Sequence, residues 1–287
     1  MEFSNLLKNI QLQQLINLTL LIFLAYSNAT LQTSLYMVVG LALFALVFEM
    51  LLNYYLDKKI FIPYSAIITA FGVILMVGWL AWYIPFVVIA LALLQKRFKI
   101  DSSHIFNPSN FAVVVAMALF YPKAAPIVGE LGKNSFVILI VLALGALILY
   151  RVNRLTISLS FVLFYTLLEY LIIGSSDPMW HFDEFVVKFY STSFIVYVIF
   201  MLTDPITTPD SRTKQILFAF VVALLAVLLD YFIGMHTRNL FIALFVTSIL
   251  FLPLYRDMCR KTYLLLLLFT SIISCNILMQ KAIYFSM

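Results

Sequence analysis

Long apolar runs separated by short polar stretches make up almost the whole chain. Eleven apolar segments can be drawn, and their lengths of roughly 15–25 residues are typical of helices that cross a bilayer. The segments cover residues 11–27, 32–55, 63–79, 81–95, 108–122, 135–150, 156–174, 187–203, 215–233, 239–254 and 262–280. The alternating ten-residue pattern of a membrane β-barrel does not occur in the sequence. The pattern therefore predicts an all-α polytopic membrane protein with about 10–11 transmembrane helices.

The composition of the chain excludes a water-soluble surface. Hydrophobic residues make up 64% of the 287 residues and charged residues 11%, whereas a soluble domain is about a quarter charged. No Gly/Ser-rich or Pro-rich linker divides the sequence, so residues 1–287 are expected to form a single transmembrane domain. Segments 63–79 and 81–95 are joined so closely, at Trp79 to Tyr83, that one of them is expected to be broken or re-entrant.

Basic residues in the short loops account for the net charge of +5 and indicate a topology. With the N-terminus in the cytoplasm, 13 of the 18 basic residues fall in cytoplasmic loops and five outside. The thirteen are Lys8, Lys58, Lys59, Lys96, Arg97, Lys99, Arg151, Arg154, Arg212, Lys214, Arg256, Arg260 and Lys261. This bias favours eleven spans, a cytoplasmic N-terminus and an external C-terminus, and no nucleic-acid partner is predicted.

The first polar interruption, residues 104–110, follows a cluster of three cations, Lys96, Arg97 and Lys99. Asn107-Pro108 is expected to begin a helix, because proline is well placed in a first helical turn. Asn107 or Ser109 would then satisfy free backbone N–H groups there. The structural interpretation of these residues is a capped helix start. A functional alternative is an anion site, for a phosphate or a flavin oxyanion, at a helix N-terminus beside three cations.

The second polar interruption, residues 201–214, is expected to end a helix at Thr203, because proline disfavours helical geometry in the residue before it. Thr207, Thr208 and Ser211 supply hydroxyls, and Arg212 and Lys214 follow. Asp204 can act as a helix cap, pair with a neighbouring cation or accept a hydrogen bond from a ligand ring N–H. Structural and functional interpretations are equally supported at this point.

Other ionisable residues give weaker indications of function. Glu49, Glu169 and Asp230 lie inside apolar segments, which makes them candidates for transport or proton relay, but each is near a segment end where water is accessible. The three histidines, His104, His181 and His236, have no metal-binding spacing, so no metal site is predicted. Cys259 and Cys275 are not expected to form a disulfide. No Walker loop, dinucleotide fingerprint or nucleophile constellation occurs.

Two short motifs carry a family resemblance. Residues 106–112, Phe-Asn-Pro-Ser-Asn-Phe-Ala, resemble an FNPA-type motif, and residues 203–209, Thr-Asp-Pro-Ile-Thr-Thr-Pro, resemble a TDPVTSP-type motif. Both are typical of the RnfD/NqrB family, whose members belong to the Rnf electron-transport complex and to the sodium-translocating NADH:quinone oxidoreductase. Glu49, residues 65–69 and Lys96 resemble further family positions, so that the similarity covers most of residues 30–257.

The resemblance implies a fold and a cofactor. The implied fold consists of two inverted five-helix repeats, similar to those of urea transporters. In this chain the repeats would be approximately residues 11–122 and 135–254, with an extra span at 262–280. Family members bind FMN or riboflavin and pass electrons across or along the membrane. The S-G-A-T-type motif that carries covalent FMN is missing, and Ser191-Thr-Ser193 lacks its pattern, so no covalent FMN is predicted. The resemblance also implies a multi-pass protein of the inner membrane of a bacterium.

The resulting hypothesis is a membrane electron-transport protein of the RnfD/NqrB type that binds FMN or riboflavin non-covalently between the two interruptions. Asn107, Ser109 and Asn110 would line one side of the site. Thr203, Asp204, Thr207 and Thr208 would line the other, and Lys96 or Arg212 would meet a negative ring or phosphate. Besides the lipid bilayer, the implied partners are other electron-transfer subunits or a flavoprotein.

Two alternatives stay open. One is a solute channel or transporter on a urea-transporter-like scaffold, and the other is a non-redox scaffold subunit whose chemistry lies in its partners. Any enzymatic activity would belong to an oxidoreductase or ion-translocating complex as a whole.

Overall fold

A computed structural model describes residues 9–59, 61–101, 103–128, 135–176, 181–234 and 237–285. The α-helices are α2 (Ile10–Ser27), α3 (Leu35–Leu52), α4 (Tyr64–Met76), α5 (Ile84–Gln95), α6 (Pro108–Phe120), α7 (Ser135–Arg151), α8 (Leu155–Leu168), α9 (Phe182–Val187), α10 (Thr192–Val196), α11 (Arg212–Ile233), α12 (Thr237–Phe251) and α13 (Arg260–Phe285). Short π-helical segments continue three of them: η1 (Asn53–Asp57) after α3, η2 (Glu169–Gly174) after α8 and η4 (Tyr197–Met201) after α10. The 3₁₀ turns η3 (Lys188–Tyr190) and η5 (Leu252–Leu254) complete the helical elements.

Each of the eleven predicted apolar segments contains a helix, and the all-α polytopic membrane class is confirmed. Within the described residues, six helical stretches are long and apolar enough to cross a bilayer, and five apolar helices are shorter. The short ones include α4 and α6, each of 13 residues. Since a helix rises 1.5 Å per residue, such a helix reaches about 20 Å and does not span a hydrocarbon core of about 30 Å. The fold therefore combines full-length and short helices.

The predicted single segment 187–203 is wrong in its first part. Phe182–Val187 and Lys188–Tyr190 form α9 and η3, and a new helix, α10, begins at Thr192. Ser191 has extended backbone angles, and its hydroxyl accepts a hydrogen bond from the backbone N–H of Phe194. A serine in this conformation is a helix N-cap, so the chain turns at Ser191 and does not continue as one helix.

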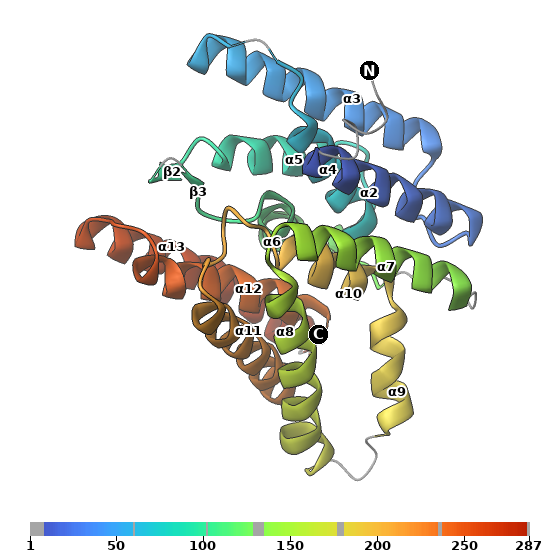
Figure 1. Cartoon of the computed structure of the whole chain (residues 1–287), viewed down its shortest axis with the longest axis vertical. Coiled ribbons are helices and arrows are strands. Elements are labelled where there is room, and N and C mark those ends of the chain that lie inside the picture. The colour runs from blue at the N-terminus through green and yellow to red at the C-terminus, as the bar shows by residue number, and fades with distance from the viewer. Residues whose placement is uncertain are drawn as a thin grey trace.

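The helices form two groups joined by a central layer. Figure 1 shows α2 to α5 at one end of the molecule and α8, α11, α12 and α13 at the other, with α6, α7 and α10 between them. Two small antiparallel pairs connect helix ends. β1 (Val77–Trp79) after α4 pairs with β4 (Ala124–Pro126) after α6, and β2 (Lys99–Ile100) pairs with β3 (Ser103–His104) just before α6. The sequence predicted a broken or re-entrant segment where residues 63–79 meet residues 81–95. The strand β1 interrupts the helical structure at this point.

Close packing of α4 on α6 fixes the start of α6. A Cβ atom placed on Gly72 would lie 2.5 Å from the Oγ of Ser109. Only a residue without a side chain permits this approach. Gly72 therefore brings the first turn of α6 directly against α4.

Apolar side chains cover the outer helix faces, as a bilayer requires. On α8, Leu159, Leu163 and Leu167 are 62%, 64% and 48% exposed and recur every four residues. This spacing places them on one face of the helix. Such a face is stable against lipid but not against water, which agrees with a membrane-embedded protein.

Candidate functional site

The two polar interruptions meet at one cavity of about 580 Å³. A volume in this range is typical of small-molecule sites, which measure about 300–1,000 Å³. Its walls come from α2, the end of α3 with η1, α4, the α5–β2 segment, the start of α6, and the stretch from η4 to Ile206. The predicted site residues that line it are Lys96, Asn107, Ser109 and Asp204. Sequence positions about a hundred residues apart thus share one wall.

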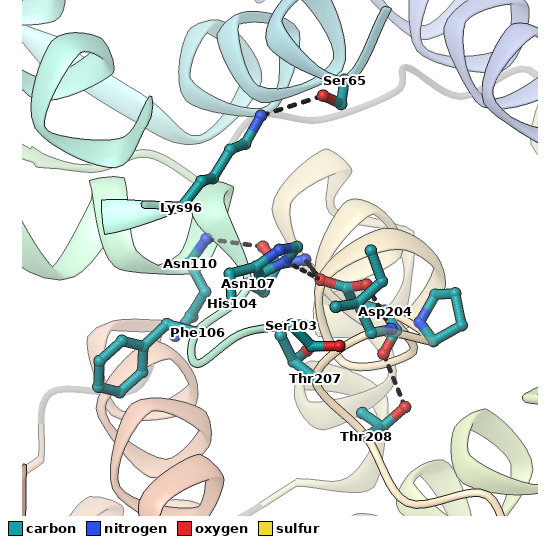
Figure 2. Close-up of polar contacts among 12 residues, drawn as sticks. Ser65, Lys96, Ser103, His104, Phe106, Asn107, Asn110, Asp204, Thr207 and Thr208 are labelled. Atoms are coloured by element: carbon teal, nitrogen blue, oxygen red, sulfur yellow. Dashed lines mark hydrogen bonds and ion pairs between the residues drawn. The ribbon is translucent and has the colours of Figure 1, made fainter. Parts of the chain in front are cut away.

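Asp204 connects the two interruptions directly. Its Oδ2 lies 3.4 Å from His104 Nε2 and accepts a hydrogen bond of 3.3 Å from the amide of Asn107. Its Oδ1 accepts one of 3.0 Å from the backbone N–H of Ile206. Figure 2 shows His104 and Asn107 pointing toward this carboxylate. Asn107 also caps α6, because its Oδ1 accepts from the Asn110 backbone N–H at 3.0 Å, and the predicted helix start is confirmed.

The Asp204 carboxylate is held in its charged form. It lies in the loop between η4 and α11, and its side chain is only 12% exposed. Burial by itself would raise the pKa of this carboxyl. The hydrogen bond and charge of His104, together with the Ile206 amide, outweigh burial and lower the pKa below its ordinary value. Asp204 therefore presents a hydrogen-bond acceptor to the cavity.

A buried ion pair forms another part of the cavity wall. Lys96 Nζ lies 3.0 Å from Glu49 Oε2 and 3.2 Å from the hydroxyl of Ser65. The side chains of Lys96 and Glu49 are 10% and 8% exposed. Figure 2 shows Lys96 extended toward Ser65, away from Asp204. Lys96 is thus a cavity residue whose charge is already balanced by Glu49.

Two arginines that the sequence indicated only as topology determinants organise the interruptions. Arg256 donates to the carbonyl oxygens of Ser103 and His104, both at 3.0 Å, and also to that of Ile206. It is 8% exposed. One guanidinium therefore ties the backbone before α6 to the backbone after Asp204, a use of several fixed donors that lysine cannot reproduce.

Arg154 holds the second interruption from its other side. It is 3% exposed, and its Nε donates to the hydroxyl of Thr208 at 2.9 Å. Its Nη2 donates to the carbonyl of Pro205 at 3.1 Å and to Asp210 at 2.5 Å. The loop conformation is therefore set by a buried cation, and no local sequence pattern distinguishes this cation from an exposed one.

The other predicted site residues lie behind the cavity wall or away from it. The amide of Asn110 donates to the Phe241 carbonyl, the hydroxyl of Thr203 to the Ile199 carbonyl, and that of Thr208 to the Asp204 carbonyl. The Thr207 carbonyl accepts from the Tyr255 hydroxyl. Arg212 is exposed at the first turn of α11 and does not line the cavity. None of these five residues lines the cavity. The predicted site residues that do line it are Lys96, Asn107, Ser109 and Asp204.

The carboxylates inside apolar segments were predicted to have access to water, but in the structure all three are buried. Glu49, Glu169 and Asp230 are 6%, 2% and 4% exposed. Glu169 lies 2.7 Å from Lys188 Nζ, and Asp230 accepts from the Tyr165 hydroxyl at 3.5 Å. Neighbouring helices enclose them even near helix ends, and Glu49 alone of the three lines the cavity.

The fold and the cavity define a class: a polytopic helical membrane protein with a polar site between two interrupted helices. A model of the NQR2, RnfD, RnfE family matches residues 117–264, which are 148 of the 287 residues. The chain belongs to this family, and it is therefore a membrane protein of the electron-transport subunit type. No individual curated protein matches the chain.

The matched range contains the second motif, residues 203–209, but not the first. The resemblance of residues 106–112 to the family therefore depends on the motif itself. Its position supports it, because Asn107 of the first motif and Asp204 of the second are hydrogen-bonded to each other.

Proposed function

We propose that the protein is a membrane electron-transport subunit that binds flavin, FMN or riboflavin, non-covalently in the cavity between the two interruptions. The main supporting observation is that Asn107 and Ser109 of the first motif line the same 580 Å³ cavity as Asp204 of the second. When bound, the flavin would supply the redox chemistry, accepting and passing on electrons.

The wall is suited to a flat ring with polar edges. Val196, Phe200 and Met201 provide an apolar surface, which favours burial of an aromatic ring. Asp204 can accept a hydrogen bond from a ring N–H, because its carboxylate is charged. The Ser109 hydroxyl, which lines the cavity, provides a donor that can meet a ring carbonyl oxygen.

The network around the cavity also favours a fixed geometry. Arg256 and Asp204 hold both interruptions in one arrangement through hydrogen bonds of 3.0–3.4 Å. A preformed site loses less conformational freedom when a ligand binds. This is a requirement for a cofactor that must keep its distance to an electron partner.

The proposed orientation places the cavity on the cytoplasmic side of a bacterial inner membrane. Lys59, Lys96, Arg97 and Lys99 line it, and all four belong to loops whose basic residues favour the cytoplasm. An electron donor or acceptor subunit, or a flavoprotein, would approach from that side.

The test is a flavin-binding measurement on the purified full-length protein in detergent. We expect a flavin absorption band after purification, or saturable quenching of added FMN or riboflavin fluorescence. Ser109→Ala should weaken binding about 3–10-fold, the effect of one hydrogen bond. Ser248→Ala is the matched control, because Ser248 is similarly buried and bonds the Leu244 carbonyl but does not line the cavity.

Colourless protein that binds neither flavin would refute the proposal. Flux of small neutral solutes into liposomes by such protein would instead support the channel alternative.

A further inference from the structure

His104 and Asp204 form a hydrogen-bonded dyad in the wall of the cavity. Asp204 Oδ2 lies 3.4 Å from His104 Nε2, and the Asp204 and His104 side chains are 12% and 14% exposed. Both residues line the cavity. The proposed flavin contacts involve Asp204 and leave the imidazole without a role. A histidine paired with a carboxylate at a ligand cavity is a candidate for proton exchange, because histidine changes charge between about pH 5 and 8.

The surrounding backbone holds both members of the dyad in place. Arg256 donates to the His104 carbonyl at 3.0 Å, and β3, which contains His104, pairs with β2. Asp204 is fixed by the Asn107 amide at 3.3 Å and by the Ile206 backbone N–H at 3.0 Å. Figure 2 shows the His104 and Asn107 side chains together at the carboxylate. A carboxylate in this position orients an imidazole and stabilises its protonated form.

The second ring nitrogen of His104 is open to the cavity. The carboxylate accepts from Nε2, so Nδ1 is the atom that can take up or give a proton. Within the part of the chain that the structure describes, no hydrogen bond reaches Nδ1, and this atom is not one of the unpaired atoms shielded from solvent. Since the imidazole lines the cavity, Nδ1 is accessible to water and to a ligand there.

Histidine is the residue type near this dyad that ordinarily titrates at neutral pH. Carboxylates ordinarily titrate below about pH 5, and phenols, ammonium groups and guanidinium groups above about pH 8. The other charged or titratable side chains that line the cavity or belong to the segments next to the dyad are, among the described residues, Glu49, Asp57, Lys59, Lys96, Arg97, Lys99, Asp101, Tyr255, Arg256 and Asp257. A change of charge near neutral pH is therefore expected at His104, and a His104 variant separates it from all the others.

We propose that His104, oriented by Asp204, takes up a proton at Nδ1 when the ligand in the cavity is reduced, and so stabilises the negative charge of the reduced ring. This inference depends on the proposed function for the identity of the ligand. Two electrons from the donor subunit and one proton from water leave the flavin ring with a single negative charge. A second proton from water forms the N–H bond at Nδ1, and the charges balance. Charge near the ring nitrogens is one means by which a protein tunes a flavin.

The position of the dyad suits this role. The ring N–H that Asp204 would accept belongs to the same pyrimidine ring as the nitrogen and the carbonyl oxygen that carry the negative charge after reduction. His104 Nε2 lies 3.4 Å from the same carboxylate, so the imidazole adjoins that end of a ring bound to Asp204. The oxidised ring is neutral and makes no such demand on the imidazole.

The deciding measurement is the midpoint potential of riboflavin bound to the full-length protein in a neutral detergent, between about pH 6 and 8. Riboflavin is the probe because it lacks the phosphate of FMN, which itself titrates at about pH 6. We expect wild-type protein to take up at least about half a proton more per two electrons than His104→Gln, and at most one. Each proton is a tenfold change in the reduction equilibrium per pH unit, or about 30 mV for a two-electron couple.

Two further variants sharpen the assignment. His181 is exposed and does not line the cavity, so His181→Gln is the matched control and should behave as wild type. His104→Lys keeps its charge over the whole range, so it should lose the extra proton yet hold a higher potential than His104→Gln at about pH 8. All variants should bind oxidised riboflavin within about threefold of wild type, less than the effect of a typical hydrogen bond.

The outcomes separate the dyad from the proposed function. Riboflavin binding with the same pH dependence of the potential in wild type and His104→Gln would overturn the role of His104 and leave flavin binding intact. An equal loss of the proton in His181→Gln would also overturn it. Absence of riboflavin binding by the wild type would overturn both. If His104→Gln does not fold, His104→Lys decides alone, because an unchanged proton count in that variant is equally contradictory.

Discussion

Removal of the Glu49 carboxylate should destabilise the protein strongly while leaving its shape intact. Glu49→Gln keeps the size of the side chain but leaves the Lys96 ammonium, 10% exposed, without its counter-charge. At 3.0 Å, two unit charges attract each other by about 5.5 kcal/mol at an effective dielectric constant of about 20. Measured costs of breaking a buried pair are about 3–5 kcal/mol.

We expect a loss near the lower end of that range, about 3 kcal/mol. Two contacts reduce the cost. The Ser65 hydroxyl stays 3.2 Å from the ammonium, and the cavity admits water to it. The measurement is unfolding in mixed detergent micelles, followed by far-ultraviolet circular dichroism. Glu49→Gln, Lys96→Met and the double variant form a cycle, and the double variant should recover at least about 2 kcal/mol of the summed losses.

Arg97 and Asp57 provide the control within the same chain. Their separation is 2.5 Å, but Asp57 is 43% exposed, so Asp57→Asn should cost at most about 1 kcal/mol. If Glu49→Gln costs no more than Asp57→Asn, the cavity screens Lys96 as bulk water would, and the assignment of a buried pair is refuted.

Four further outcomes are expected. Gly72→Ala should cost about 1–3 kcal/mol of stability, because the new methyl meets Ser109; thermal unfolding should show no such loss for Gly40→Ala, where no atom lies within 4 Å. Asp204→Asn should lower stability at neutral pH. Since the folded-state pKa of this carboxyl is below its ordinary 3.8, its contribution is present above pH 3.8 and is lost as the pH falls further. The difference in melting temperature between wild type and Asp204→Asn should therefore shrink below about pH 4, and a constant difference would contradict the charged state assigned to Asp204. Lys188→Met should destabilise the protein by about 2–3 kcal/mol, because it leaves a buried carboxylate without its lysine, yet flavin titration should show unchanged affinity. In denaturing gels under ultraviolet light the protein band should show no flavin fluorescence, since no covalent attachment is predicted; a fluorescent band would refute that prediction.

Hydrophobic periodicity and proline positions predicted much of this fold, because they act locally. A helix occurs in each of the eleven apolar runs, and Asn107-Pro108 begins α6 as expected. Such features depend on neighbours within a few residues. The prediction of one continuous segment over residues 187–203 was wrong in its first part. That part ends at Ser191, which resembles any other serine in an apolar run, so no local signal marks the break.

The candidate site was predicted in part. Asn107 and Asp204 were identified through proline breaks and meet as expected, with 3.3 Å between amide and carboxylate. Arg154 and Arg256 were not identified, because loop arginines that set topology and buried arginines that bond carbonyls look alike in sequence. Their roles depend on contacts 50 or more residues away, such as Arg256 with His104. No local pattern records a contact of that range.

The two halves share a layout that bears on how the cavity arose. Glu49 in α3 stands fourteen residues after the first residue of that helix, and Glu169, the first residue of η2, stands fourteen residues after the first residue of α8. The π-helical segment η1 follows α3, and η2 begins at Glu169. Glu49 pairs with Lys96 at 3.0 Å, and Glu169 pairs with Lys188 at 2.7 Å. An internal duplication would leave this layout, so it supports the inverted repeat, which stays a prediction. The first pair lines the cavity and the second does not. If the halves are related, the paired carboxylate is an inherited structural element. The first half differs in what surrounds this pair, because the turn at Asn53 and the interruption that contains Asp204 line the same cavity.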